Sequence, residues 1–172
     1  MSSSLLEIMS RLQERPESVA ELLRDALQVA LPYNTEAHLE TTLRHCFGKT
    51  VAPPDLLITL NDHVSPSGLC TPVFAVAIEA LMECESEKRF TWPFYSAALR
   101  AKLRCPTCVL VITPDPIVER WARQPILTGQ PDSSFRPLVL GPPFVVAEEI
   151  EPSSVREMAL FSLLSRGSSG VA

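Results

Sequence analysis

Two carboxylates stand at the edge of, or inside, apolar runs of the sequence. Asp55 follows Pro54 and opens the run 55–60, and Glu79 interrupts the second run, 72–82. Burial of a charged carboxylate in an apolar strand is unfavourable unless a metal, a proton or a partner compensates it. Two acids on neighbouring strands can share a divalent cation, which activates a water for attack on phosphate. Ligands that are all oxygen atoms favour Mg²⁺.

The position two residues after Glu79 argues against this chemistry. A metal-dependent phosphodiesterase of this pattern has Lys or Gln there, and this chain has Leu81. Leucine cannot orient a water or stabilise developing charge, and loss of one such group commonly costs about 10² to 10³ in rate. Lys88 is a candidate replacement. The structural alternative is that Asp55 only begins its strand and that Glu79 pairs with a nearby Arg or Lys.

Other reactive residues lack the spacing of a site. Cys105 and Cys108 form a Cys-x-x-Cys pair, but the pair follows a predicted helix and precedes a predicted strand, which reverses the thioredoxin-like order. Cys46, Cys70 and Cys84 are isolated, so a four-ligand zinc site is not indicated. The three histidines lack metal-ligand spacing. No serine lies in a nucleophile elbow, and no glycine-rich loop for phosphate is present.

Length and composition indicate one domain inside a cell. The 172 residues are 46% hydrophobic, which is enough for one core, and we expect a domain over 1–166 and a flexible tail over 167–172. The net charge of -5 gives no overall footprint for nucleic acid. Five irregularly spaced cysteines suit a reducing compartment. Neither a signal peptide nor a spanning segment is predicted, so the prediction is a cytoplasmic protein with no membrane contact.

Periodicity predicts an α/β fold with a central mixed sheet flanked by helices and an N-terminal helix pair within 1–30. The segment around 35–48 fits either a helix or a strand, and we lean to a strand. Thr91 and Asp115 are predicted helix caps. The aromatic side chains of 90–95 suit either a core or base stacking, and helical spacing favours the core. The predicted helices are 4–14, 17–28, 90–103, 116–123 and 153–165, and the predicted strands are 55–60, 72–82, 108–113, 136–140 and 144–149.

Several stretches carry a resemblance to a known family. They are KRFTWPFY (88–95), LRAKLRCP (99–106), VITPD (111–115) with Trp121, and LGP (140–142). With these stretches the chain, from Leu5 to about Leu164, resembles a family of actinobacterial and myxobacterial proteins with a PD-(D/E)XK nuclease-like core of the Rpn and transposase-like kind. The resemblance implies a metal site at Glu40, Asp55 and Glu79. Leu81 departs from the Gln of that pattern, whereas Lys88 is shared with it.

The resemblance, together with the departure from the family pattern at Leu81, implies a catalytically degenerate nuclease fold. We expect a cytoplasmic protein-binding or regulatory module that uses its sheet edge or its N-terminal helix pair, with a protein partner or a second copy as a homodimer. The alternative is a Mg²⁺-dependent nuclease that cleaves DNA phosphodiester bonds. In it Asp55 and Glu79 bind the metal, Glu40 assists and Lys88 replaces the missing residue. A nucleic-acid binder without cleavage is a third hypothesis, and the acidic balance counts against it.

Overall fold

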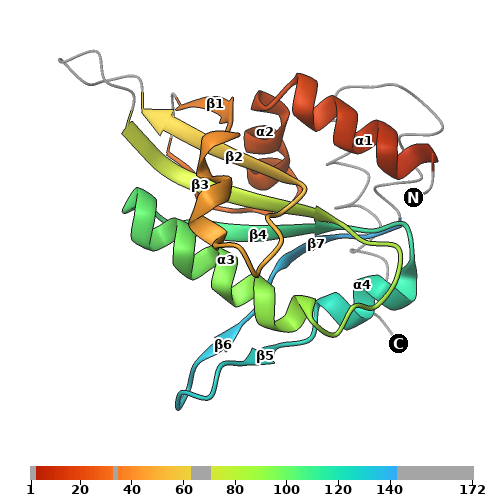
Figure 1. The fold of residues 1–172 in the computed structure, drawn as a ribbon. Helices are drawn as coiled ribbons and strands as arrows, with labels where there is room; N and C mark the ends of the chain where they lie inside the picture. Colours follow the sequence, from red (N-terminus) through yellow and green to blue (C-terminus); the bar gives the residue numbers. More distant parts are fainter. Residues whose placement is uncertain (1–2, 33–34, 63–70, 143–172) are drawn as a thin grey trace.

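The structure, a computed structural model, describes residues 3–32, 35–62 and 71–142 (Figure 1). Within these ranges, the longer helices and strands follow one another in the order that the sequence periodicity predicts. The elements are α1 (Ser3–Glu14), α2 (Glu17–Asp25), β1 (Thr35–Leu39), the 3-10 helix η1 (Thr42–Phe47), β2 (Leu56–Asp62), β3 (Thr71–Ala80), α3 (Lys88–Leu103), β4 (Thr107–Ile112), α4 (Pro116–Ala122), β5 (Ile126–Leu127), β6 (Ser134–Phe135) and β7 (Leu138–Leu140).

The main sheet has five strands in the order β1-β2-β3-β4-β7. The first three strands are antiparallel neighbours, with Leu56 opposite Ile78 in the β2–β3 pair. Strand β4 pairs with β3 in parallel, with Glu79 opposite Val111, and β7 continues the parallel part. A parallel neighbour requires a crossover, which α3 supplies between β3 and β4. The structure confirms the predicted α/β fold with a mixed central sheet.

Apolar side chains cover both faces of the sheet, because successive residues of a strand point to opposite sides. Ile58 and Ile78 belong to the core cluster on the side of α1 and α2. Leu57 and Ala77, one position away, belong to the cluster on the side of α3 and α4. Figure 1 shows these helix pairs on opposite sides of the sheet. The side chain of Glu79 shares its face with Ala77 and therefore points toward α3.

The N-terminal helix pair is confirmed, with α1 ending at Glu14 and α2 beginning after Pro16. The ambiguous segment 35–48 contains both alternatives in succession, since β1 ends at Leu39 and η1 begins at Thr42. Short periodic patterns of three apolar residues do not distinguish such a pair from one continuous element.

Helix α3 begins at Lys88, so the prediction that Thr91 caps it is wrong. Thr91 lies inside the first turn, where its hydroxyl donates to the carbonyl of Lys88 at 3.4 Å. Pro93 is accommodated within the helix. The error has a physical origin, because a Thr before an apolar stretch resembles a cap whenever the preceding turn is polar.

The segment after β4 is confirmed in part. Asp115 caps α4, and its carboxylate accepts from the backbone N–H groups of Ile117 at 2.6 Å and Val118 at 3.2 Å. The hairpin formed by β5 and β6 was not predicted, because strands of two residues carry no periodicity. Strand β7 lies within the predicted strand 136–140. The predicted strand 144–149, the helix 153–165 and the tail 167–172 lie outside the described residues. Among the described helices, none has the length and apolar character needed to cross a membrane.

Candidate functional site

Glu79 is a buried carboxylate near the end of β3, with 1% of its surface exposed. One face of α3 supplies its partners, since Lys88, Trp92 and Tyr95 follow the spacing of residues that lie one above another on a helix. Lys88 Nζ lies 2.7 Å from Oε2 and 2.9 Å from Oε1 of Glu79. Trp92 Nε1 donates to Oε2 at 3.1 Å, and the Tyr95 hydroxyl lies 3.3 Å from Oε1.

Both oxygens of the Glu79 carboxylate accept from donors on α3. An ionised carboxylate offers about four lone-pair sites on its two oxygens. Lys88 contacts both oxygens and Trp92 donates to Oε2, whereas the single proton of the Tyr95 hydroxyl is divided between Oε1 and a closer backbone carbonyl. A metal ion at Glu79 would have to compete with the Lys88 ammonium group, which contacts both oxygens. The ion pair expected from the structural alternative is therefore present, and two neutral donors complete it.

Tyr95 links this carboxylate to the segment before β2. Its hydroxyl donates to the carbonyl oxygen of Ala52 at 2.6 Å, and the longer contact to Glu79 uses the same proton. Burial, and then the negative charge of Glu79, raise the pKa of Tyr95 well above its ordinary value, so the phenol stays protonated. The ring contacts Phe47 edge to face at 5.0 Å between centroids. These contacts fix the hydroxyl in its donating position.

Asp55 lies immediately before β2 and is exposed. Its Oδ2 accepts from the backbone N–H of Ala80 at 2.9 Å, and Ala80 is the neighbour of Glu79. The structure thus brings the first two predicted site residues to the same end of adjacent strands. Asp55 uses one oxygen to hold β2 against the end of β3, while Glu79 faces α3.

Glu40 follows β1 and is half-buried. Its two carboxylate oxygens accept from the hydroxyls of Thr59 at 3.3 Å and Thr42 at 3.2 Å. Over the ranges 3–32, 35–62 and 71–142, no group of three or more His, Cys, Asp or Glu side chains is arranged to hold a metal ion. The Glu40 carboxylate therefore accepts hydrogen bonds from two nearby threonine hydroxyls.

The residue that departs from the nuclease pattern has a clear structural role. Leu81 is 2% exposed and packs in the core cluster beneath α3. Lys88 does reach the Glu79 carboxylate, as its proposed replacement role requires. It does so as a cation paired to both oxygens, with 21% of its side chain exposed.

The aromatic stretch 90–95 divides between core and surface. Trp92 and Tyr95 are buried, in agreement with the core interpretation, whereas Phe90 is 81% exposed and Phe94 is also exposed. Sequence reasoning missed Trp92 and Tyr95 as donors to Glu79. Their spacing from Lys88 was the available signal, because a buried acid needs donors and these three residues share a helix face.

The cysteine pair lies at the junction between α3 and β4, as the structural interpretation predicted, and both thiols are free. Burial raises the pKa of Cys108 to about 12. Burial also raises the pKa of Cys105, against a smaller opposing effect of Arg100. Both groups are therefore neutral thiols of low reactivity near neutral pH.

A groove lies beside the first turns of α3. Its volume is about 640 Å³, and the large exposed apolar side chains of its lining are Phe90 and Leu127, the latter 84% exposed. Arg89 closes one side by donating to the carbonyl of Pro125 at 2.8 Å and lying over the ring of Trp121. The full lining is Ser86, Arg89, Phe90, Pro93, Pro125, Ile126, Leu127 and Thr128.

Comparison of the chain with protein-family models, with curated proteins and with solved structures gives no match in any of the three.

Proposed function

We propose that this chain is a PD-(D/E)XK-like protein whose metal site has become a structural ion pair, and that it acts in the cytoplasm as a protein-binding module. The observation that carries the proposal is the burial of the Glu79 carboxylate among donors of α3, with Lys88 on both oxygens, Trp92 on Oε2 and the Tyr95 hydroxyl close to Oε1. A buried carboxylate that is paired with a cation and hydrogen-bonded within the protein is typical of a structural group.

Topology supports the nuclease-like part of the proposal. The order of α2, β1, β2, β3, α3 and β4 places three antiparallel strands before a helical crossover to a parallel strand. Asp55 precedes the second strand of this unit and Glu79 lies near the end of the third. These are the positions that the resemblance assigns to the acids. Leu81, buried in the hydrophobic core, supports the loss of catalysis.

The metal content of the site is tested by calorimetry with Mg²⁺ and with Mn²⁺. We expect no heat of binding to the wild-type protein at millimolar metal, and none after Leu81→Gln. Saturable binding that is lost in Asp55→Ala would contradict the proposal. It would favour the alternative, a Mg²⁺-dependent nuclease, for which the contact between Lys88 and Glu79 is the supporting observation.

The groove beside α3 supports the protein-binding part of the proposal. Neighbouring exposed apolar side chains indicate an interaction site more strongly than single ones do, and Phe90 and Leu127 both line this groove. Exposed Glu85 and Glu87 flank Ser86, which lines the groove. Arg89 keeps its positive charge, but backbone carbonyls and the Trp121 ring hold its guanidinium group at one side of the groove. The partner that fits is a protein segment with a large apolar side chain next to Lys or Arg.

The partner chemistry is tested with two fluorescent peptides of equal length, each with a central Phe-Leu pair. One carries flanking lysines and the other flanking glutamates. We expect tighter binding of the lysine peptide, and Leu127→Asp should weaken it by at least about tenfold because it removes the apolar contact. Leu6→Asp on α1 is the matched control, since Leu6 is exposed but remote in the fold. Equal loss in both variants, or no binding of either peptide, would contradict the groove as the docking surface.

A further inference from the structure

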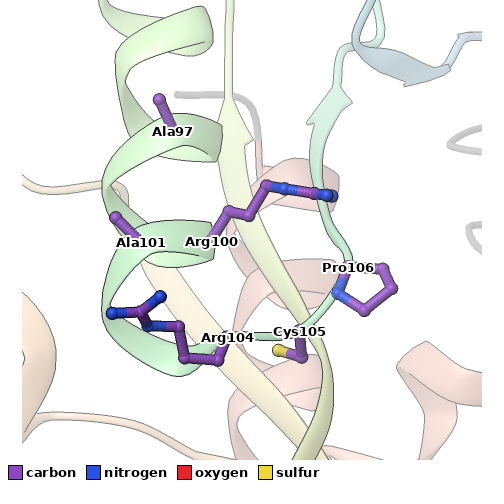
Figure 2. A pocket seen from close by; sticks show the side chains of 6 residues that line it. All are labelled: Ala97, Arg100, Ala101, Arg104, Cys105 and Pro106. Atoms are coloured by element: carbon purple, nitrogen blue, oxygen red, sulfur yellow. The ribbon is translucent and has the colours of Figure 1, made fainter.

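The last turn of α3 forms a second concave surface, separate from the groove at its first turns. Figure 2 shows Ala97, Arg100, Ala101 and Arg104 on successive turns of the helix and Cys105 and Pro106 on the segment that follows. These six residues line a pocket of about 540 Å³. That volume is within the range of about 300 to 1,000 Å³ that is typical of small-molecule sites.

The pocket is positively charged within an acidic chain. Residues 88–114 contain no Asp or Glu, whereas the whole chain has a net charge of -5. Arg100, Lys102 and Arg104 are exposed. Across the described ranges, no hydrogen bond or ion pair engages any of these three side chains. Their charge is therefore available to a ligand.

Stabilisation of the helix explains only part of this arrangement. Cations in the last turn interact favourably with the negative end of the helix dipole, typically by about 0.3 to 1 kcal/mol. Lys102 satisfies that requirement without lining the pocket. Arg104, by contrast, has left-handed backbone angles of φ 60° and ψ 28°, where Gly is the favoured residue. The helix end alone gives no reason for an arginine at this position.

The other pocket walls suit an anion. Ala97 and Ala101 lie on the same helix face as Arg104, and their small side chains leave the space open. Cys105 contributes no negative charge, since its thiol is neutral. In Figure 2 the Arg100 side chain extends toward Pro106, whereas the Arg104 guanidinium lies beside Ala101. A ligand that contacts both guanidinium groups therefore has to span the pocket.

We propose that this pocket binds a small molecule that carries a diphosphate group, with Arg100 and Arg104 each contacting one phosphate. A guanidinium group matches the oxygens of a phosphate with two parallel hydrogen bonds. A diphosphate carries two phosphate groups, one for each of the two separated guanidinium groups, whereas a single phosphate carries only one. The limited volume of this open pocket and the net negative charge of the chain favour a small ligand over a nucleic-acid strand. This inference is independent of the function proposed for the groove and for Glu79.

The test is calorimetric titration of the full chain with inorganic pyrophosphate and with inorganic phosphate, at matched ionic strength. Pyrophosphate should bind more tightly than phosphate. Arg100→Gln and Arg104→Gln should each weaken it by at least about tenfold, because each removes a charge-assisted pair of hydrogen bonds. Lys102→Gln is the matched control, since it removes a cation of the same turn that does not line the pocket. Its effect should be less than about threefold, the size expected for a screened surface charge.

Four results would overturn the proposal. The first is no pyrophosphate binding at millimolar concentration, and the second is equal affinity for phosphate and pyrophosphate. The third is a Lys102→Gln effect as large as those of the two arginine variants, which would indicate diffuse surface attraction.

A short single-stranded oligonucleotide, titrated in parallel, separates the sources of phosphate. Tighter binding of the oligonucleotide than of pyrophosphate, with dependence on Lys102, would assign the surface to nucleic acid and overturn the small-molecule proposal. All three substituted side chains are exposed, so the variants are expected to fold, and circular dichroism checks this.

Discussion

The charged side chains at the two ends of α3 lie in opposite environments, one paired with a buried carboxylate and the others exposed to solvent. At the first turn Lys88 pairs with a carboxylate that is almost wholly buried. At the last turn Arg100 and Arg104 are exposed, and neither side chain has a hydrogen-bond or ion-pair partner in the part of the chain that the structure describes. The first end sits against the strand end where the resemblance places catalysis, and the second sits where no site was expected.

This difference shows that the type and position of a residue do not by themselves define a functional site. Of the acids that suggested metal chemistry, Glu79 uses both oxygens toward α3, and Asp55 uses one of its two oxygens toward the backbone of Ala80. Free charge lies instead around a pocket at the other end of the helix. Unused hydrogen-bonding capacity is therefore the better guide to where this protein meets a ligand.

The largest expected effect is on the first end of the helix. Lys88→Met would leave the Glu79 carboxylate buried without its cation, and we expect the free energy of unfolding to fall by about 3 to 5 kcal/mol. Urea denaturation measures this change. Lys102→Met, at an exposed lysine of the same helix, should change stability by no more than about 0.5 kcal/mol. A Lys88 variant as stable as the Lys102 variant would show that the ion pair does not hold the two elements together.

A smaller effect is expected from Tyr95→Phe. The variant keeps the ring against Phe47 and removes only the hydroxyl that serves Glu79 and Ala52. Loss of one donor to a buried charged group should lower the free energy of unfolding by about 1 to 2 kcal/mol. The same urea experiment applies. An unchanged midpoint would mean that Lys88 and Trp92 satisfy the carboxylate without the phenol.

At the second end a substitution should stabilise the protein. Arg104→Gly removes the side chain from a residue with left-handed backbone angles, and we expect the free energy of unfolding to rise by up to about 1 kcal/mol. The same variant should bind pyrophosphate more weakly than the wild type. A gain in stability with a loss of affinity would sharpen the contrast between the two ends. A loss of stability would show that the Arg104 side chain has a structural role.

Much of the sheet could be predicted from the sequence. Long apolar runs gave β2, β3 and β4, and Asp115 with Pro116 marked the start of α4, because these signals are local. The hairpin of β5 and β6 could not be predicted, since strands of two residues depend on their packing. The start of α3 was misplaced because its first turn follows an acidic loop with no side-chain cap.

The sequence predicts where the residues of the candidate site lie, but it does not predict the contacts that they make. Sequence reasoning brought Asp55 and Glu79 to neighbouring strands and named Lys88 as a residue that could reach them. It could not show which carboxylate oxygens already accept hydrogen bonds, because the positions of Trp92 and Tyr95 in the sequence are equally typical of core residues. Nor could it find the arginine pocket, which depends on how the end of α3 meets the segment before β4.

The central claim, that Glu79 is a structural carboxylate held by Lys88, is tested most directly by a double-mutant cycle in urea. The variants are Glu79→Gln, Lys88→Met and the two combined. We predict that each single variant destabilises the protein and that the double variant is more stable than the sum of the single effects implies. The coupling should be at least about 2 kcal/mol, because the second change removes the unpaired partner left by the first. A Glu79→Gln variant more stable than the wild type, with no coupling to Lys88, would contradict the account and indicate a carboxylate retained for chemistry at the expense of stability.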